Sequence, residues 1–467
     1  MLLTEKTSAL RLVEKIDAEG SPNQQLLPLS ARVNDQNHLE IGGCDVVELV
    51  QKFGSSLYIV DELTLRSSAR QYRDAFKNYY TGESQVIYAS KAWCCTAIVA
   101  ILASEGIGFD VVSGGELYTT TRALNMTHQD PNYAENKIYL HGNNKSYDEL
   151  ELAVHSKCKI IVDNWLELKN LTEISTKKAQ NVSILIRLTP GIECHTHEYI
   201  RTGIIDSKFG FDAHQLDEVF AYIKQQDYLQ CIGLHAHIGS QIFELQPHHD
   251  LAGVLADWYK KALDYGLPMQ ELNVGGGLGI RYTESDDPPS IDEWVKTVAN
   301  AVTRACQERN LALPKLISEP GRSLVGSSCI TAYTVGGRKE IPNVRTYIAV
   351  DGGMSDNPRP ITYQSLYEVI IANKMNQHCS ETVTVAGKHC ESGDILVKNV
   401  ALPPTETGDI LVIMATGAYN YSMASNYNRI ARPAAVVVKE GEANLIIRRE
   451  TLEDLVKQDV LPNRLGE

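Results

Sequence analysis

Eight short runs rich in β-branched and aromatic residues recur between residues 86 and 318, and they constrain the fold more than any other feature. They span residues 86–90, 109–112, 138–141, 160–163, 182–188, 232–238, 272–274 and 315–318. Most of the intervening segments carry apolar residues at helical spacing, for example 92–104, 147–154, 166–175, 250–263 and 291–309. Strands that alternate with helices pair in parallel, and eight such units close a (β/α)8 barrel. We therefore predict an α/β chain with a TIM-type barrel; an open doubly wound sheet remains the alternative, because counting strands does not prove closure.

The pattern changes after about residue 325. Predicted strands at 328–335, 346–350, 382–385, 394–398, 410–414, 434–439 and 445–448 are separated by turns, among them Gly336-Gly337, with little helix between them. This pattern predicts a C-terminal antiparallel β domain. A chain of 467 residues is long enough for two or three domains at roughly 100–200 residues each.

We divide the chain into three parts on this basis. Residues 1–45 are polar and irregular, and they form an N-terminal extension that is either wrapped on the body or partly disordered. Residues 46–325 form the barrel, although the first segment, 46–61, could pair with the β domain. Residues 326–467 form the β domain.

Charge and apolar patterning exclude two classes of function. The 58 acidic residues outnumber the 44 basic ones, and a net charge of −14 argues against a general nucleic-acid binder. The longest wholly apolar run in the first half of the chain, 97–103, has seven residues, whereas a membrane span needs about 20. The ten cysteines are scattered without any C-x-x-C pair, and no signal peptide is recognisable. We expect a cytoplasmic protein with reduced cysteines.

Residues suited to chemistry stand at the ends of four predicted strands, where barrel enzymes place their active sites. Lys91 ends the first strand, and an amine there can form a Schiff base. His235 and His237 end the sixth strand; they could bind a metal, pack within the core or lie flat on a cofactor. The glycines of NVGGGLGI leave backbone N–H groups accessible to an anion such as phosphate.

The eighth strand ends in SEPGR, which brings Glu319 and Arg322 to the same mouth. A carboxylate and a guanidinium there can bind separate charged atoms of a ligand, or pair with each other beside the turn. Each of these residues alone also fits a structural role. Together, a lysine, histidines, a triple glycine and a Glu/Arg pair at four strand ends are hard to assign to packing.

The chain resembles the pyridoxal-phosphate-dependent decarboxylases with an alanine-racemase-like barrel, from about residue 45 to 460. The resemblance rests on YASKA, FDVVSGGEL, HTHEYIRTGIIDSKFGF, GLHAHIGSQ, NVGGGLGI, SEPGR, DGGMSDNPRPITY, CESGD and GAYNYSMASNYN. So many motifs in one order make the resemblance specific. One departure is Trp93, which occupies a position where the family commonly has asparagine, and we expect local repacking there.

The resemblance implies a pyridoxal 5'-phosphate cofactor at the barrel mouth and no metal. Lys91 would hold the cofactor as a Schiff base, and His237 would stack on its ring. Glu319 would bind the pyridine nitrogen and keep it protonated, which makes the ring a strong electron sink. A racemase of this fold places an arginine there, so Glu319 favours a decarboxylase. Further cofactor contacts are implied at Ser240, Gly277, Gly321, Arg322 and Tyr419.

The resemblance also implies a homodimer with a composite active site. Cys390 would be the acid that reprotonates Cα after CO2 leaves, because a thiol can donate and recover a proton near neutrality. In the family, the residues at the positions of Cys390 and Glu391 come from the partner subunit. Contacts to the small-molecule substrate are implied at Arg322, Arg359, Tyr363, Glu391 and Tyr419.

The motifs are most similar to those of family members that convert meso-2,6-diaminopimelate to L-lysine and CO2, the last step of lysine biosynthesis. This substrate carries an amine and a carboxylate at each end. Its remote end therefore needs a negative group of the protein for the amine and a positive group for the carboxylate. Glu391 would supply the first, and Arg322 and Arg359 the second. Ornithine or arginine would need only acidic recognition of the remote end.

Three alternatives remain open at this stage. The first is an enzyme of the same fold that decarboxylates ornithine, arginine or carboxynorspermidine. The second is a metal-dependent barrel hydrolase built on His235 and His237, for which no carboxylate partner is obvious in the sequence. The third is a binding or regulatory homologue that has lost catalysis; the presence of each expected catalytic residue counts against it.

Overall fold

The barrel predicted from the eight runs is confirmed. The computed structural model describes residues 8–16, 20–127, 132–192 and 207–466. Eight parallel strands close in the order β10-β11-β12-β5-β6-β7-β8-β9, and closure is made where β12 pairs with β5. The strands are β5 (Ser84–Ala89), β6 (Gly108–Val111), β7 (Ile138–Leu140), β8 (Lys159–Val162), β9 (Val182–Arg187), β10 (Leu229–His235), β11 (Glu271–Asn273) and β12 (Lys315–Ser318).

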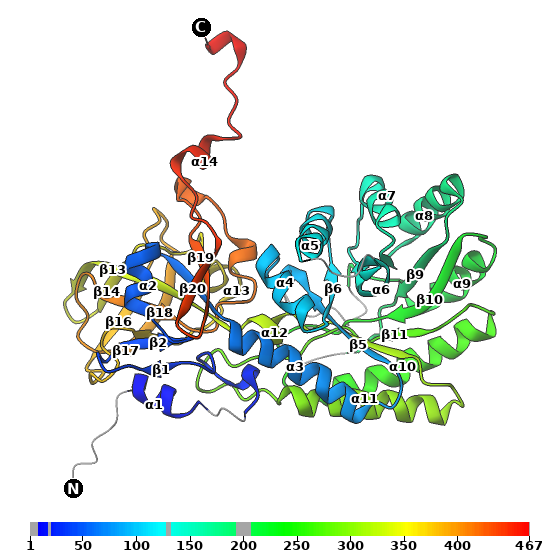
Figure 1. Cartoon of the computed structure of the whole chain (residues 1–467), viewed down its shortest axis with the longest axis horizontal. Helices are drawn as coiled ribbons and strands as arrows, with labels where there is room; N and C mark the ends of the chain where they lie inside the picture. Colours follow the sequence, from blue (N-terminus) through cyan, green and yellow to red (C-terminus); the bar gives the residue numbers. More distant parts are fainter. Residues whose placement is uncertain (1–7, 17–19, 128–131, 193–206, 467) are drawn as a thin grey trace.

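Helices surround the barrel (Figure 1). The principal ones are α3 (Glu62–Tyr79), α4 (Thr96–Ser104), α5 (Gly114–Met126), α7 (Tyr147–His155), α8 (Trp165–Lys178), α9 (Leu216–Lys224), α10 (Gln246–Asp264) and α11 (Ile291–Glu308). Ser146 and Ser290 begin α7 and α11 with capping boxes, in which a serine and a glutamate satisfy the first free backbone N–H groups. No helix in the described ranges is long and apolar enough to cross a membrane.

The barrel interior is filled with apolar side chains rather than left open. A buried cluster joins residues of six strands: Ile87, Tyr139, Ile161, Leu185, Ile232 and Ile317. At the amino-terminal ends of the strands, Glu271 accepts hydrogen bonds from Lys159 (2.5 Å) and from Tyr139 Oη (3.0 Å). This packing closes the barrel at one end and leaves the carboxyl ends of the strands for chemistry.

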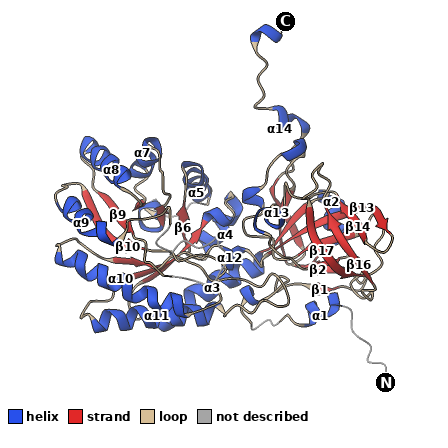
Figure 2. Cartoon of the chain, turned by 180° about the vertical axis from the view of Figure 1, so that it is seen from behind, coloured by secondary structure: helices blue, strands red, loops and turns tan. Residues whose placement is uncertain are grey.

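The C-terminal domain is a sheet with the strand order β17-β16-β14-β13-β4-β19-β20, to which β18 and β15 are attached. Its strands are β4 (Leu57–Asp61), β13 (Cys329–Ile341), β14 (Arg345–Val350), β15 (Val369–Ile371), β16 (Glu381–Ala386), β17 (Ile395–Leu402), β18 (Ile410–Ile413), β19 (Ala434–Lys439) and β20 (Glu442–Ile447). Most neighbouring pairs are antiparallel, as expected; β4–β19 and β14–β16 run parallel. Figure 2 shows this sheet beside the barrel.

Two details of the domain differ from the sequence prediction. Gly336-Gly337 is not a turn between strands: β13 continues through it, and its register with β14 shifts between Val335 and Arg338. Two glycines without side chains fit such a bulge. The short strand β15 was missed, because three apolar residues give too little pattern to separate strand from loop.

The described part of the N-terminal extension is packed on the body. It contains the 3-10 turn η1 (Pro22–Gln24) and the small sheet of β1 (Arg32–Val33), β2 (Leu39–Ile41) and β3 (Cys44–Asp45), followed by α2 (Val46–Phe53). Leu39 and Ile41 are fully buried against residues of the β domain, including Val412 and Val436. At the other end of the chain, α14 (Leu452–Val456) stands away from the body (Figure 1).

Candidate active site

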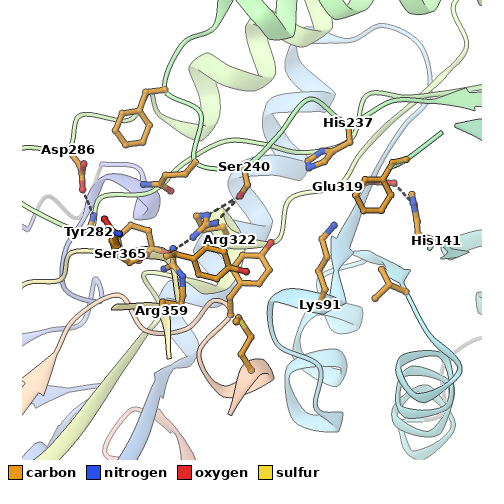
Figure 3. Close-up of a pocket in the computed structure, with 18 of the residues that line it drawn as sticks. Lys91, His141, His237, Ser240, Tyr282, Asp286, Glu319, Arg322, Arg359 and Ser365 are labelled. Atoms are coloured by element: carbon orange, nitrogen blue, oxygen red, sulfur yellow. Dashed lines mark hydrogen bonds and ion pairs between the residues drawn. The ribbon is translucent and has the colours of Figure 1, made fainter. Parts of the chain in front are cut away.

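A cavity of about 1280 Å³ lies at the carboxyl ends of the barrel strands, where the β domain meets the barrel. The short helix α13 (Arg359–Tyr363) contributes to its wall from the β-domain side. Nine of the residues singled out in the sequence line it: Lys91, His235, His237, Ser240, Glu319, Arg322, Arg359, Tyr363 and Tyr419. Figure 3 shows Lys91 between Glu319 and the two arginines.

Lys91 lies in the turn η2 (Ser90–Ala92) that directly follows β5. The β domain fastens this turn, since Tyr419 N and Ser422 Oγ both donate to Ala92 O, at 2.8 and 2.9 Å. Burial opposes the charged form of Lys91, but the negative charges of Asp110 and Glu319 outweigh it, and the pKa of Lys91 is raised. These surroundings favour the charged form of the amine.

Glu319 is the centre of a buried hydrogen-bond cluster. Its carboxylate accepts from Asn273 Nδ2 at 2.6 Å and lies 2.8 Å from His141 Nε2 and 3.1 Å from His235 Nε2. Burial opposes ionisation, but the two histidines outweigh it and hold the pKa of Glu319 well below its usual value. Burial lowers the pKa of His235 to about 4, so this histidine is neutral at pH 7. The result is a fixed carboxylate at the cavity wall.

His235 and His237 do not act as a pair. His237 lies past the end of β10, and its Nδ1 accepts from Gly276 N at 3.2 Å, whereas His235 faces Glu319. Among the described residues, His141, His235 and Glu319 hold possible metal-ligand atoms within 4.8 Å of one another, and His237 is not part of this cluster. Glu319 is distant from His235 in the sequence, so the spacing of the two histidines could not reveal this contact.

The glycine turn after β11 requires residues without a side chain. A Cβ on Gly275 would lie 2.7 Å from Ala236 O, and one on Gly276 would lie 2.3 Å from Glu319 O. Gly277 has a positive φ of +129°, and a Cβ there would meet His248. Gly321 packs closely against Ala89 at the end of β5, which joins the SEPGR turn to the strand before Lys91. The glycines therefore allow the two turns to pack closely on neighbouring backbone, and the described wall of the cavity includes neither Gly277 nor Gly321.

Two buried arginines stand beside tyrosines in the same cavity. Arg322 donates to Ser240 Oγ at 3.0 Å and to Tyr282 Oη at 2.6 Å. Arg359 donates to Tyr367 Oη at 2.7 Å, and its guanidinium lies 4.8 Å from the ring centre of Tyr282. No carboxylate is bonded to either guanidinium among the described residues, so both positive charges are available to an anionic ligand.

Cys390 and Glu391 do not line the cavity of their own chain. Both are exposed in the loop before β17. Asp394 holds this loop in place, because its Oδ2 lies 2.7 Å from His389 Nδ1. Cys390 N donates to Asn428 Oδ1 at 2.8 Å, and Tyr427 Oη to Glu391 Oε2 at 3.4 Å. One quoted motif, residues 195–211, lies mostly outside the described residues.

Several cavity residues escaped the sequence analysis, among them His141, Arg187 and Tyr282. His141 directly follows β7 and Arg187 ends β9, so their position at a strand end was a usable signal. Tyr282 follows the glycine turn by five residues and gave no such signal. Trp93 is buried and stacks on Tyr421, with 5.4 Å between ring centres.

These features fit pyridoxal phosphate: an amine at a strand end, an ionised carboxylate for the ring nitrogen, and a hydroxyl and a guanidinium, Ser240 and Arg322, for the phosphate. Together with the barrel they define a pyridoxal-dependent enzyme. The family model "Pyridoxal-dependent decarboxylase, pyridoxal binding domain" matches residues 64–326, more than half of the chain. The chain belongs to this family; it is a carboxy-lyase, and its cofactor is pyridoxal 5'-phosphate.

Several of the similar proteins are named diaminopimelate decarboxylase. A diaminopimelate decarboxylase of Synechocystis sp. is 66% identical over 451 residues, which cover 97% of this chain and 96% of that protein. One of Bacillus subtilis is 44% identical over 447 residues, 94% of this chain and 98% of its own. A crystal structure of the enzyme from M. jannaschii in complex with L-lysine superposes with a TM-score of 0.85 at 32% identity, covering 93% of this chain and 99% of that one.

Replacing Glu319 by glutamine should reduce turnover about 100-fold while the cofactor remains bound, because a neutral amide cannot stabilise a protonated ring nitrogen. Steady-state kinetics with the absorption spectrum of the bound cofactor measure both effects. Glu271→Gln is the matched control, since Glu271 is a buried barrel carboxylate at the opposite end of the strands. An unchanged turnover number in Glu319→Gln would contradict this role.

Proposed function

We propose that this chain decarboxylates meso-2,6-diaminopimelate to L-lysine and CO2, the last step of lysine biosynthesis. The observation that carries the proposal is the pair of buried guanidinium groups in the cavity, Arg322 and Arg359, with no protein carboxylate bonded to them in the described residues. L-Lysine retains the carboxylate at the remote end of the substrate, and two arginines suit that group. Ornithine and arginine have no remote carboxylate.

In this proposal each residue of the site has a separate role toward the cofactor. Lys91 would hold the cofactor covalently, His237 would stack on its ring, and Glu319 would keep the ring nitrogen protonated. Bound pyridoxal phosphate would supply an electron sink for the electron pair that departing CO2 leaves behind. Ser240, Gly277, Gly321, Arg322 and Tyr419 would hold the phosphate.

The arginines fix the substrate by its remote carboxylate. Arg322 donates to both Ser240, an expected phosphate contact, and Tyr282, so it would orient the substrate relative to the cofactor. Tyr363 and Tyr419 border the same space. A substrate without the remote carboxylate would leave two buried positive charges unpaired, a penalty that gives discrimination.

The active unit in this proposal is a homodimer. Cys390 and Glu391 are exposed and absent from the wall of their own cavity, so they are free to enter the cavity of a second copy. There Cys390 protonates Cα, and Glu391 meets the remote ammonium group. Arg429 donates to Leu455 O and is adjacent to Asn428, which accepts from Cys390 N; the C-terminal segment near this contact has exposed apolar side chains that support a partner surface. They are Leu452, Val456, Val460, Leu461 and Leu465.

We propose that the reaction takes place in the cytoplasm. The nine cysteines within the described residues form no disulfide, which is typical of a reducing compartment.

Incubating the purified protein and pyridoxal phosphate with four candidate substrates tests the proposal: meso-diaminopimelate, ornithine, arginine and carboxynorspermidine. Mass spectrometry should find L-lysine from diaminopimelate and no amine product from the other three. A product from another substrate would overturn the role of the two arginines. A protein that binds the cofactor and turns over none of them would be a regulatory homologue.

A further inference from the structure

The N-terminal segment 20–25 lies against the barrel loop that follows the glycine turn, and the family resemblance gave it no role. Asn23 is completely buried, and its Nδ2 donates to Gly279 O at 3.1 Å and to Pro289 O at 2.9 Å. Gly279 and Pro289 are the two ends of the loop 279–289. One amide thus ties both ends of the loop together.

Neighbouring bonds strengthen this tie. Arg281 N donates to Asn23 O at 2.9 Å, Gln24 Nε2 donates to Pro288 O at 2.9 Å, and Ile291 N donates to Ser21 Oγ at 3.1 Å. A segment about 260 residues away in sequence therefore supplies hydrogen bonds that the loop does not make by itself. If these hydrogen bonds were lost, the backbone of the loop would be less firmly held in place.

The loop carries Tyr282 into the cavity. Tyr282 N donates to Asp286 Oδ2 at 2.9 Å, which fixes the turn (Figure 3). Its hydroxyl accepts from Arg322, and its ring lies 4.8 Å from the guanidinium of Arg359 and 5.2 Å from the ring of Tyr367. Burial alone would raise the pKa of Tyr282, but the two arginines outweigh it and lower that pKa. One tyrosine therefore contacts both positive groups.

We propose that Asn23 and Tyr282 are positioning residues for carboxylate recognition: the N-terminal segment fixes the loop, and Tyr282 sets the separation and orientation of Arg322 and Arg359. This inference rests on the proposed function, in which the two arginines bind the remote carboxylate of the substrate. It predicts that a variant with a loosened N-terminal segment binds carboxylate-bearing ligands more weakly. Binding of an amine that has no carboxylate should not be weakened.

L-Lysine and cadaverine form a matched pair of probes, since cadaverine is lysine without its carboxylate. Calorimetry on the cofactor-loaded enzyme would measure both dissociation constants for wild type, Asn23→Ala, Tyr282→Phe and the double variant. Asn34→Ala is the control: Asn34 lies in the same extension, but its amide donates to Asp45 and makes no bond to the loop. The KM and kcat for meso-diaminopimelate complete the set.

Each single variant should weaken L-lysine binding and raise KM about tenfold, the typical effect of one hydrogen bond to a charged group, with cadaverine binding changed less than about twofold. The double variant should bind L-lysine about as weakly as Tyr282→Phe alone, because Asn23 acts through Tyr282. Asn34→Ala should match wild type.

Equal weakening of both amines, or unchanged L-lysine binding in Tyr282→Phe, would overturn the inference, even if Asn23→Ala proved too unstable to purify. Additive effects in the double variant would remove Tyr282 as the link. These measurements need no turnover. A wild-type enzyme that makes no lysine would instead disprove the proposed function, so the two failures are distinguishable.

Discussion

Replacing Lys91 by alanine should lower turnover of meso-diaminopimelate by about 10⁴-fold or more and abolish the visible absorption of lysine-bound cofactor. The side chain is the cavity amine that lies between Glu319 and the arginines, and no other lysine lines the described cavity wall. Without it the cofactor is held by non-covalent contacts alone, and the group that exchanges with the substrate amine is missing. Absorption spectroscopy and steady-state kinetics measure the two effects separately.

Two variants control this experiment. Lys91→Arg retains a positive charge but cannot hold the cofactor covalently, so it should be as inactive as Lys91→Ala. Lys159→Ala removes a lysine at the amino-terminal end of β8, opposite the cavity, and should keep the absorption band. A retained band in Lys91→Ala would show that another amine holds the cofactor.

Replacing Cys390 by alanine should lower product formation about 10³-fold with little change in cofactor binding or substrate KM. In the proposed reaction the thiol would give a proton to the carbon that has lost CO2, and a positioned proton donor contributes about 10²- to 10⁴-fold in typical enzymes. Cys379→Ala, in the same domain, is the matched control and should be fully active. Full activity in Cys390→Ala would mean that another group donates the proton.

Mixing the two inactive variants tests whether the thiol crosses between subunits. When Lys91→Ala and Cys390→Ala subunits pair at random, half of the dimers are mixed, and each has one cavity with both groups intact. Activity should therefore return to about one quarter of the wild-type value. No recovery in dimers shown by mass to be mixed would place Cys390 in the cavity of its own chain.

The barrel was predictable because its signal is local and repeated. Each of the eight strands is a short apolar run whose neighbours have helical spacing, and the observed bounds differ from the predicted ones by three residues at most. The β domain was less regular: β4 (Leu57–Asp61) sits between β13 and β19, which follow it by more than 260 and 370 residues. Pairing at such separation leaves no periodic trace in the sequence.

The residues of the site divide in the same way. Lys91, Glu319 and Arg322 stand at strand ends within recognisable motifs, so the sequence placed them at the barrel mouth. It missed His141 as a partner of Glu319 and Tyr282 as a partner of two arginines, because those contacts join elements distant in the chain. It named Cys390 through family resemblance only, and the cavity wall of a single chain does not include it.

The sequence by itself determined the alternation of strands and helices, the identity of the residues at the strand ends and the family to which they belong. These properties follow from the local spacing of residues, because neighbouring residues decide which face of an element is buried and where each strand ends. Tertiary structure decided closure of the barrel, ionisation of Glu319 beside two histidines and the tie between Asn23 and the loop of Tyr282. Each depends on burial and distance between remote segments, and these exist only once the chain has folded.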